Sequence, residues 1–160
     1  MTEKLGVSVS PELLDLALTH RSFAYESGGI PTNERLEFLG DSVLGLVITE
    51  SLYERFPDLD ESRLSPLRSG IVNMRALAAI ARDLKLGEAL KIGKGEEITG
   101  GRDKNSILAD AFEALVGAIY IDKGYAKTRE VILTLMARSI EEASIRGAGR
   151  SEEHTSELQS

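Results

Sequence analysis

Apolar residues recur at helical spacing along most of the chain, and glycine or proline separates one such segment from the next. The segments predict five helical regions, which run from Ser10 to about Tyr25, from Thr32 or Asn33 to Pro57, from Asp58–Asp60 to Leu86, from Asn105 or Ser106 to Gly124, and from about Ala126 to Ile145. Five glycines between Gly87 and Gly101 predict a loop. No segment alternates apolar and polar residues as a half-buried strand does. The predicted fold class is therefore all-α.

The length and composition fit one globular domain, because 160 residues with 42% hydrophobic and 28% charged side chains can bury a core and leave little room for a second domain. The longest nearly apolar stretch, Ala114 to Ile121, has eight residues, whereas crossing a bilayer takes roughly 20. The N-terminus shows no basic region followed by an apolar one. We therefore expect no membrane partner. The chain contains no cysteine, which fits a reducing compartment, and we expect a cytoplasmic protein.

The last eleven residues, RSEEHTSELQS from Arg150 to Ser160, depart abruptly from the helical pattern. They look like the translation of a sequencing adaptor, so we interpret residues 1–149 as the domain and 150–160 as a non-native tail. The net charge is −7 for the whole chain and −5 for residues 1–149, which hold 18 basic and 23 acidic side chains. Only residues 63–104 are basic, with 9 basic and 5 acidic side chains. An acidic chain argues against a nucleic-acid footprint over its whole surface.

Acidic residues interrupt two helical segments that are otherwise apolar on nearly every side. In the segment NERLEFLGDS, Glu34, Glu37 and Asp41 fall within roughly 60° of one another on the helix surface. In the segment ADAFEALVGAIYID, Asp110 and Glu113 are three residues apart. A helix that is apolar all round is normally buried, so these two stripes predict a shared acidic site where the helices meet.

Acids in the first turn of a helix can also simply complement the helix dipole, and this reading is open for either stripe alone. Converging carboxylates need a proton or a cation, and oxygen ligands select Mg2+, with Mn2+ able to substitute. A di-iron bundle would need Glu-x-x-His on its helices, and the only histidines are His20 and His154. We interpret His20 as a hydrogen-bonded packing residue.

The glycine-rich segment GEALKIGKGE is not a P-loop, because no Ser or Thr follows its Gly-Lys and no strand precedes it. Its cations and those that follow either contact phosphate or simply solubilise a connection. The candidates for phosphate contact, and hence for nucleic-acid binding, are Lys91, Lys94, Arg102 and Lys104.

Four segments together resemble one known family. NERLEFLGDS (33–42) closely resembles the signature of ribonuclease III, the double-stranded-RNA endonucleases, and KNSILADAFEALVGAIYIDKG (104–124) resembles the family's second block. LSPLRSGIVN and IGKGEEITGGRDKNS also fit, so the resemblance covers nearly all of residues 5–146. It implies the all-helical endonuclease domain, a homodimer, and Mg2+-dependent hydrolysis of double-stranded RNA that leaves 5′-phosphate and 3′-hydroxyl ends with short 3′ overhangs. The family's substrates include rRNA and mRNA precursors.

The resemblance also implies roles for individual residues. Glu37, Asp41, Asp110 and Glu113 match the metal-binding acids, with Asp41 and Glu113 as the catalytic pair. Glu34 and Glu61 match auxiliary acids, and Phe38 matches an aromatic that inserts into the partner subunit. Bacterial members usually append a basic double-stranded-RNA-binding domain, whereas here the chain stops soon after GAGR, so we expect weak RNA binding.

Two other functions are compatible with the same helices. The first is a non-catalytic relative that binds structured RNA or a ribosomal partner. The second is a helical metal-binding or scaffold protein unrelated to RNA. All four metal-binding acids are present, and this favours the enzyme.

Overall fold

The computed structural model describes residues 1–147, and the predicted tail 150–160 lies outside them. The helices are α1 (Thr2–Leu5), α2 (Pro11–Ala17), α3 (Arg21–Glu26), α4 (Glu34–Arg55), α5 (Glu61–Ile71), α6 (Met74–Asp83), α7 (Leu86–Ala89), α8 (Lys94–Ile98), the 3-10 turn η1 (Gly101–Asp103), α9 (Asn105–Lys123) and α10 (Tyr125–Leu135). Residues 137–147 are also helical. Within residues 1–147 the only extended pairing is an isolated bridge between Thr19 and Lys91, so the all-α prediction is confirmed.

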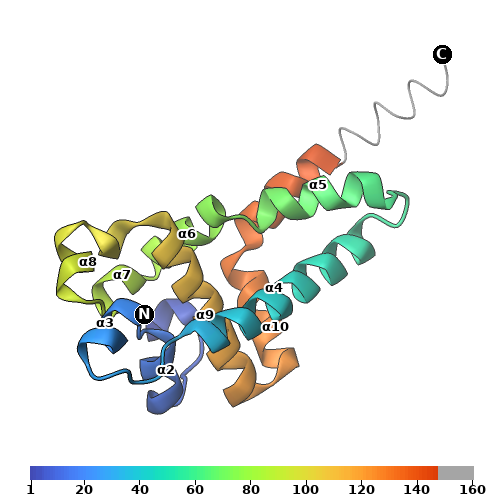
Figure 1. The fold of residues 1–160 in the computed structure, drawn as a ribbon. Coiled ribbons are helices and arrows are strands. Elements are labelled where there is room, and N and C mark those ends of the chain that lie inside the picture. Colours follow the sequence, from blue (N-terminus) through green and yellow to red (C-terminus); the bar gives the residue numbers. More distant parts are fainter. Residues whose placement is uncertain (148–160) are drawn as a thin grey trace.

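Helix α9 lies at the centre of the fold and contacts α2, α4, α6 and α10. Its side chains Phe112, Leu115 and Ile119 are almost completely buried. Helix α4 packs along α9 with Leu44 and Ile48, which are also buried. Figure 1 shows α4 and α5 extending side by side away from the short helices α2, α3, α7 and α8, which lie at the end of the fold where α4 begins.

The expectation that α4 is buried on every side is wrong. Phe38, Leu46 and Tyr53 of this helix are exposed, at 80%, 55% and 74% of their surface. Three large apolar side chains of this helix are therefore left uncovered by the rest of residues 1–147.

The first predicted helix is in fact two helices, because residues 18–20 leave the helical path. The backbone N–H of Lys91 donates to the carbonyl of Leu18 (2.8 Å), and the N–H of His20 donates to the carbonyl of Lys91 (3.0 Å). His20 then begins α3 as its N-cap. The apolar period continues through this break, so the sequence pattern alone could not show it.

Three further boundaries differ from the prediction. The helical region expected to run to Leu86 is interrupted at Asn73, whose side chain accepts a hydrogen bond from the N–H of Ala76 (2.9 Å) and so begins α6. Asn105 does not cap α9, because its side-chain oxygen accepts from Arg82 (2.7 Å). The last helix is interrupted at Met136, which is fully buried.

The glycine-rich loop contains the short helices α7 and α8 and the turn η1. One guanidinium ties it together: Nη1 of Arg102 donates to the carbonyls of Gly87 (2.9 Å) and Leu90 (2.6 Å). The two N–H groups of this Nη1 atom thus supply hydrogen bonds to two backbone carbonyls that accept none from a helix or sheet within residues 1–147. The segment is a folded connection that leads into α9.

Candidate active site

Helices α4 and α9 cross in direct backbone contact because each places a glycine at the crossing. A Cβ atom on Gly40 would lie 1.7 Å from the carbonyl oxygen of Glu113, and one on Gly117 would lie 2.3 Å from the carbonyl oxygen of Leu36. Real Cβ atoms essentially never approach other atoms to within 3.0 Å. No side chain can therefore separate the two backbones at this point, and residues one turn away on both helices are brought together.

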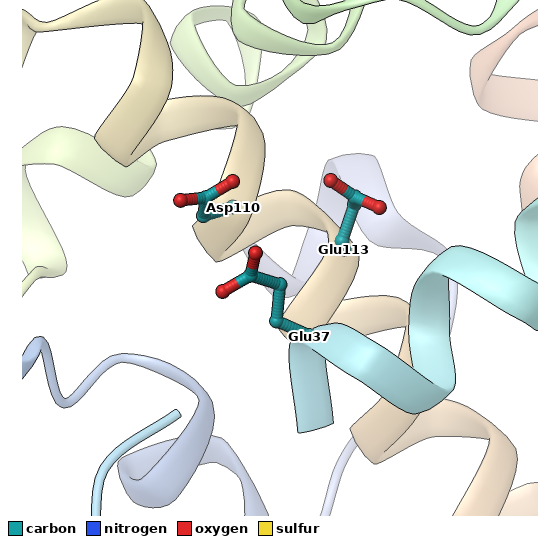
Figure 2. Close-up of side chains that lie close together, drawn as sticks. All are labelled: Glu37, Asp110 and Glu113. Carbon is teal, nitrogen blue, oxygen red and sulfur yellow. The ribbon is translucent and has the colours of Figure 1, made fainter. Parts of the chain in front are cut away.

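The acidic stripes meet one turn from this crossing. Glu37 on α4 and Asp110 and Glu113 on α9 each place one carboxylate oxygen within 4.8 Å of the others. Figure 2 shows the three side chains gathered in the space between the two helices. All three are half-buried. The prediction of a shared acidic site at the meeting of the two helices agrees with this geometry.

Asp41 lies beside this group and not within it. Its side chain is exposed and makes a hydrogen bond with the carboxyl group of Glu113. Glu34, Glu37, Phe38, Asp41 and Glu113 together line a pocket of about 380 Å³. The structure thus brings all four predicted metal-binding acids to one place, with Asp41 at its open side.

Crowding of the carboxylates changes their acidity. Burial, followed by the hydrogen bond and the charge of Asp41, raises the pKa of Glu113 to about 9. Burial and the neighbouring Asp110 raise the pKa of Glu37 to about 7. Burial also raises the pKa of Asp110. Without a cation, the site therefore holds protons at neutral pH, because so many charges cannot remain ionised together.

The same group fits a divalent cation. It offers only oxygen ligands, carries an excess of negative charge, and places three donor atoms close enough for one ion. Hard cations such as Mg2+ and Mn2+ prefer this donor set. A bound cation would neutralise the charge that otherwise keeps Glu113 protonated.

The two auxiliary acids lie in different places. Glu34 is exposed at the start of α4, lines the pocket described above, and accepts a hydrogen bond from the hydroxyl of Thr32 (3.1 Å). Glu61 begins α5 and lines a separate pocket of about 450 Å³ with Tyr53 and Arg68. Within one chain the structure does not bring Glu61 to the acidic site.

Phe38 projects from α4 next to the acids, and 80% of its surface is exposed. It borders an apolar groove of about 790 Å³, whose lining includes Leu13, Leu16, Leu39 and Ile121. An exposed aromatic ring beside an apolar groove marks an interaction surface. The predicted contact with a partner subunit requires an exposed position of this kind, and it stays a prediction.

Three of the four predicted RNA-binding cations form ion pairs within the chain. Lys91 forms an ion pair with Asp15. Lys104 pairs with Glu96 (3.2 Å). Arg102 binds two carbonyls and Glu97, so its role is to hold the connection together. Lys94 differs: its side chain is exposed, and its backbone N–H donates to Glu26.

Two features of the site were missed from the sequence. Gly40 creates the helix crossing, and the signal for it was a glycine inside a long helix, where it costs about 1 kcal/mol relative to alanine and so needs a structural reason. The second is a polar pocket of about 370 Å³ next to the acids, lined partly by His20 and Arg21. His20, which we interpreted as a hydrogen-bonded packing residue, is hydrogen-bonded as the N-cap of α3 and also lines this pocket.

In the described helices, no stretch combines the length and the apolar character that a membrane crossing requires.

Comparison with known proteins finds one family. The model of the family described as ribonuclease-III-like matches residues 10–140. Ribonuclease 3 of Thermobifida fusca is 58% identical over 147 residues, which are 92% of this chain and 61% of that protein. Ribonuclease 3 of Nocardia farcinica is 59% identical over 152 residues, which are 93% of this chain and 63% of that protein. The chain therefore spans less than two thirds of the length of these relatives.

A solved structure agrees in fold as well as in sequence. The nuclease domain of ribonuclease III from Campylobacter jejuni superposes with a TM-score of 0.81 and 40% identity, covering 88% of this chain and 96% of that domain. The description of that structure names a region involved in dimer formation. The helical architecture described above is thus that of a nuclease domain.

Proposed function

Because the chain belongs to the ribonuclease III family, we propose that it is a metal-dependent endoribonuclease that hydrolyses double-stranded RNA. The observation that carries this proposal is the meeting of four carboxylates at the crossing of α4 and α9. The acids occupy the positions that the family resemblance assigns to metal binding. The products are 5′-phosphate and 3′-hydroxyl ends with short 3′ overhangs, and the substrates are rRNA and mRNA precursors.

The carboxylates of the site would share one cation in this proposal. Glu37, Asp110 and Glu113 would hold Mg2+ or Mn2+, since their oxygens are close enough to share one ion. We assign Asp41, which lines the same pocket beside Glu113, to the same ion as the fourth acid. When bound, the cation activates water and stabilises the charge that develops on the scissile phosphate. The acids alone would repel the RNA phosphates, so a bound cation favours binding of the substrate at this site.

RNA recognition would follow from shape. A-form RNA exposes phosphates and 2′-hydroxyls along a shallow minor groove, and these groups are independent of sequence. Lys94 is the exposed cation among the predicted RNA contacts. We assign Lys94 to the flanking backbone, and assign Lys91, Arg102 and Lys104 to maintaining the fold around it.

The proposal predicts strict dependence on a divalent cation. We expect cleavage of a double-stranded RNA with Mg2+ or Mn2+ and none with EDTA. Ca2+ should bind without supporting cleavage, because its looser coordination does not impose the same geometry. The measurement is gel analysis of an end-labelled duplex, which also reports the overhang and the end groups.

The outcomes of this assay separate the competing functions. Cleavage that is equal in EDTA would contradict the carboxylate site. A protein that binds the duplex and never cleaves it would be a non-catalytic relative. A protein that binds the cation and ignores RNA would be a helical metal-binding protein unrelated to RNA.

Cation binding should release protons. The pKa of about 9 for Glu113 and of about 7 for Glu37 means that these carboxyls hold protons near neutral pH, and a cation displaces them. The apparent affinity for Mg2+ should therefore rise as the pH increases toward 9. Calorimetry at pH 7 in buffers of different ionisation enthalpy measures the number of protons released, which we expect to be between about one and two per ion. A binding heat that is independent of the buffer would contradict this.

Dimerisation should depend on Phe38. In the proposed homodimer, its exposed ring enters the apolar groove of the partner, and removal of a well-packed phenylalanine typically costs about 3–5 kcal/mol. We expect Phe38→Ala to weaken the dimer by about two orders of magnitude or more, measured by sedimentation. Tyr25→Ala is the matched control, since Tyr25 is another exposed aromatic residue (76%) and does not line this groove. Equal sedimentation of Phe38→Ala and wild type at micromolar concentration would rule out this contact.

A further inference from the structure

A second pocket adjoins the acidic site and shares Glu37 and Asp110 with it. Its volume is about 370 Å³, and it is lined from α3, α4, α8 and α9. The complete lining is His20, Arg21, Asn33, Glu34, Glu37, Glu96, Ser106, Ile107 and Asp110. A strand that presents its phosphate to the acids would have its neighbouring nucleotide at this pocket.

Hydrogen bonds fix the orientation and the tautomer of His20. The backbone N–H of Ser22 donates to Nδ1 of His20 (3.2 Å). The Ser22 hydroxyl accepts from the N–H of Gly93 (2.8 Å), which leaves its own hydrogen for the same Nδ1 atom (2.8 Å). Because Nδ1 is an acceptor in these bonds, the neutral ring carries its proton on Nε2.

His20 lines the pocket together with acidic residues. Burial lowers the pKa of His20, against the opposing effects of Glu96, Asp110 and Glu34. These three acids line the pocket, as does the ring itself. The pocket therefore combines an N–H donor, supplied by Nε2, with carboxylate acceptors.

This combination suits a hydroxyl group and not a phosphate. A hydroxyl both accepts and donates a hydrogen bond, so it can satisfy an N–H donor and a carboxylate at the same time. A phosphate would be repelled by Glu34 and by the shared acids Glu37 and Asp110. Arg21 lines the pocket as a cation, whereas Glu96 already has Lys104 as its partner.

We propose that this pocket binds a ribose 2′-hydroxyl of the RNA strand next to the scissile phosphate, with the Nε2–H of His20 as the donor. The proposal rests on the proposed function and extends it, because it assigns to His20 the distinction between RNA and DNA at this nucleotide. The 2′-hydroxyl is the group that differs between the two nucleic acids.

A variant can remove this donor while keeping the N-cap. In His20→Asn, the side-chain oxygen can still accept from the N–H of Ser22, and asparagine is a favoured N-cap residue. The Nε2–H donor is lost. Ser10→Asn is the matched control, since Ser10 caps α2 through the N–H of Leu13 and does not line the pocket. Thermal unfolding should show both variants folded, with midpoints close to that of the wild type.

The test is a thermodynamic double-mutant cycle, in which His20→Asn is combined with single 2′-deoxy substitutions in the RNA. The 2′-deoxy substitution is placed in turn at each nucleotide that flanks the scissile phosphate. For the wild type and for Ser10→Asn, we expect one position at which 2′-deoxy lowers kcat/KM about tenfold. For His20→Asn, kcat/KM on the all-RNA duplex should already be about tenfold lower, and 2′-deoxy at that position should cost nothing more.

The same cycle is then measured as duplex affinity in the Glu113→Gln background with Mg2+, so that it does not require turnover. Coupling at one position, in either measurement, supports the subsite. Effects of His20→Asn and 2′-deoxy that are independent at every position in both measurements would show that His20 is only a cap, and would overturn the proposal. A wild type that binds RNA without cutting it would refute the proposed activity, while the affinity cycle would still decide on the subsite.

Discussion

Glu113→Gln should lower the rate of RNA cleavage by several orders of magnitude. The substitution keeps the size of the side chain and its capacity for hydrogen bonding, and removes one negative charge from the acids that share an ion. We expect Glu113→Gln to lower kcat and kcat/KM by the same factor, which marks the loss of an interaction made in the transition state. Single-turnover kinetics should therefore show a defect in the chemical step. Duplex binding should persist. Nearly normal turnover would show that the chemical step does not require this carboxylate.

The same variant should make the metal-free domain more stable. In the folded protein the pKa of Glu113 is raised to about 9 from an ordinary value of 4.5, mainly by burial. The folded state therefore binds this proton more tightly than the unfolded state does between these values. Stability contributed by the protonated carboxyl is present below about pH 4.5 and is lost progressively as the pH rises toward 9. Glutamine carries no charge and avoids this loss.

Thermal unfolding in EDTA measures this effect. The midpoint of Glu113→Gln should exceed that of the wild type at pH 7, and the difference should grow between pH 5 and pH 9. Mg2+ should raise the midpoint of the wild type and have a smaller effect on the variant. Glu141→Gln, which alters an exposed carboxylate outside the site, serves as the control. Parallel pH profiles of the wild type and Glu113→Gln would contradict the buried-charge account. A higher unfolding midpoint for Glu113→Gln than for the wild type would also show that the acidic site is maintained at the expense of stability.

The sequence was sufficient to place the acids because helical periodicity is a local property. The spacings of Glu34, Glu37 and Asp41, and of Asp110 and Glu113, place each set on one stripe whatever the rest of the fold does. The apolar surroundings of both stripes indicated that they face another helix. The structure adds the finding that Asp41 lies at the open side of the site and binds Glu113.

Features that depend on distant partners could not be predicted from the same pattern. The interruption between α2 and α3 depends on backbone hydrogen bonds with Lys91, more than 70 residues further along the chain. The structural role of Arg102 depends on where the carbonyls of Gly87 and Leu90 lie. Composition indicated only that the segment was basic and rich in glycine. Tertiary contacts therefore decided which cations stayed exposed.

The position of Glu61 shows a further limit. The family resemblance makes this residue an auxiliary acid, whereas within one chain it lines a different pocket with Tyr53 and Arg68. The homodimer that we propose would bring surfaces of two chains together around Phe38. A residue that acts at a site of the other subunit cannot be placed from one chain, whether by its sequence or by its fold.

Gly40→Ala should disrupt the helix crossing and, with it, both stability and activity. The new methyl carbon would lie 1.7 Å from the carbonyl oxygen of Glu113, and that oxygen belongs to the backbone, so α4 and α9 would have to move apart. Overpacking of a well-packed interior typically costs about 1–3 kcal/mol, and occasionally more, and a backbone contact this close lies at the upper end or beyond. Separation of the helices would also draw Glu37 away from Asp110 and Glu113.

Gly45→Ala provides the matched control, because it makes the same substitution on the same helix, where a Cβ atom would meet nothing within 4 Å. Alanine is favoured over glycine inside a helix by about 1 kcal/mol, so Gly45→Ala should be as stable as the wild type or slightly more stable. Urea unfolding should therefore separate the two variants in opposite directions. Gly40→Ala should also lose Mg2+ affinity under conditions in which it is still folded. If Gly40→Ala unfolds at the same urea concentration as Gly45→Ala, the two helices do not depend on this glycine for their approach, and the position of the acids must be set by the packing of the surrounding side chains.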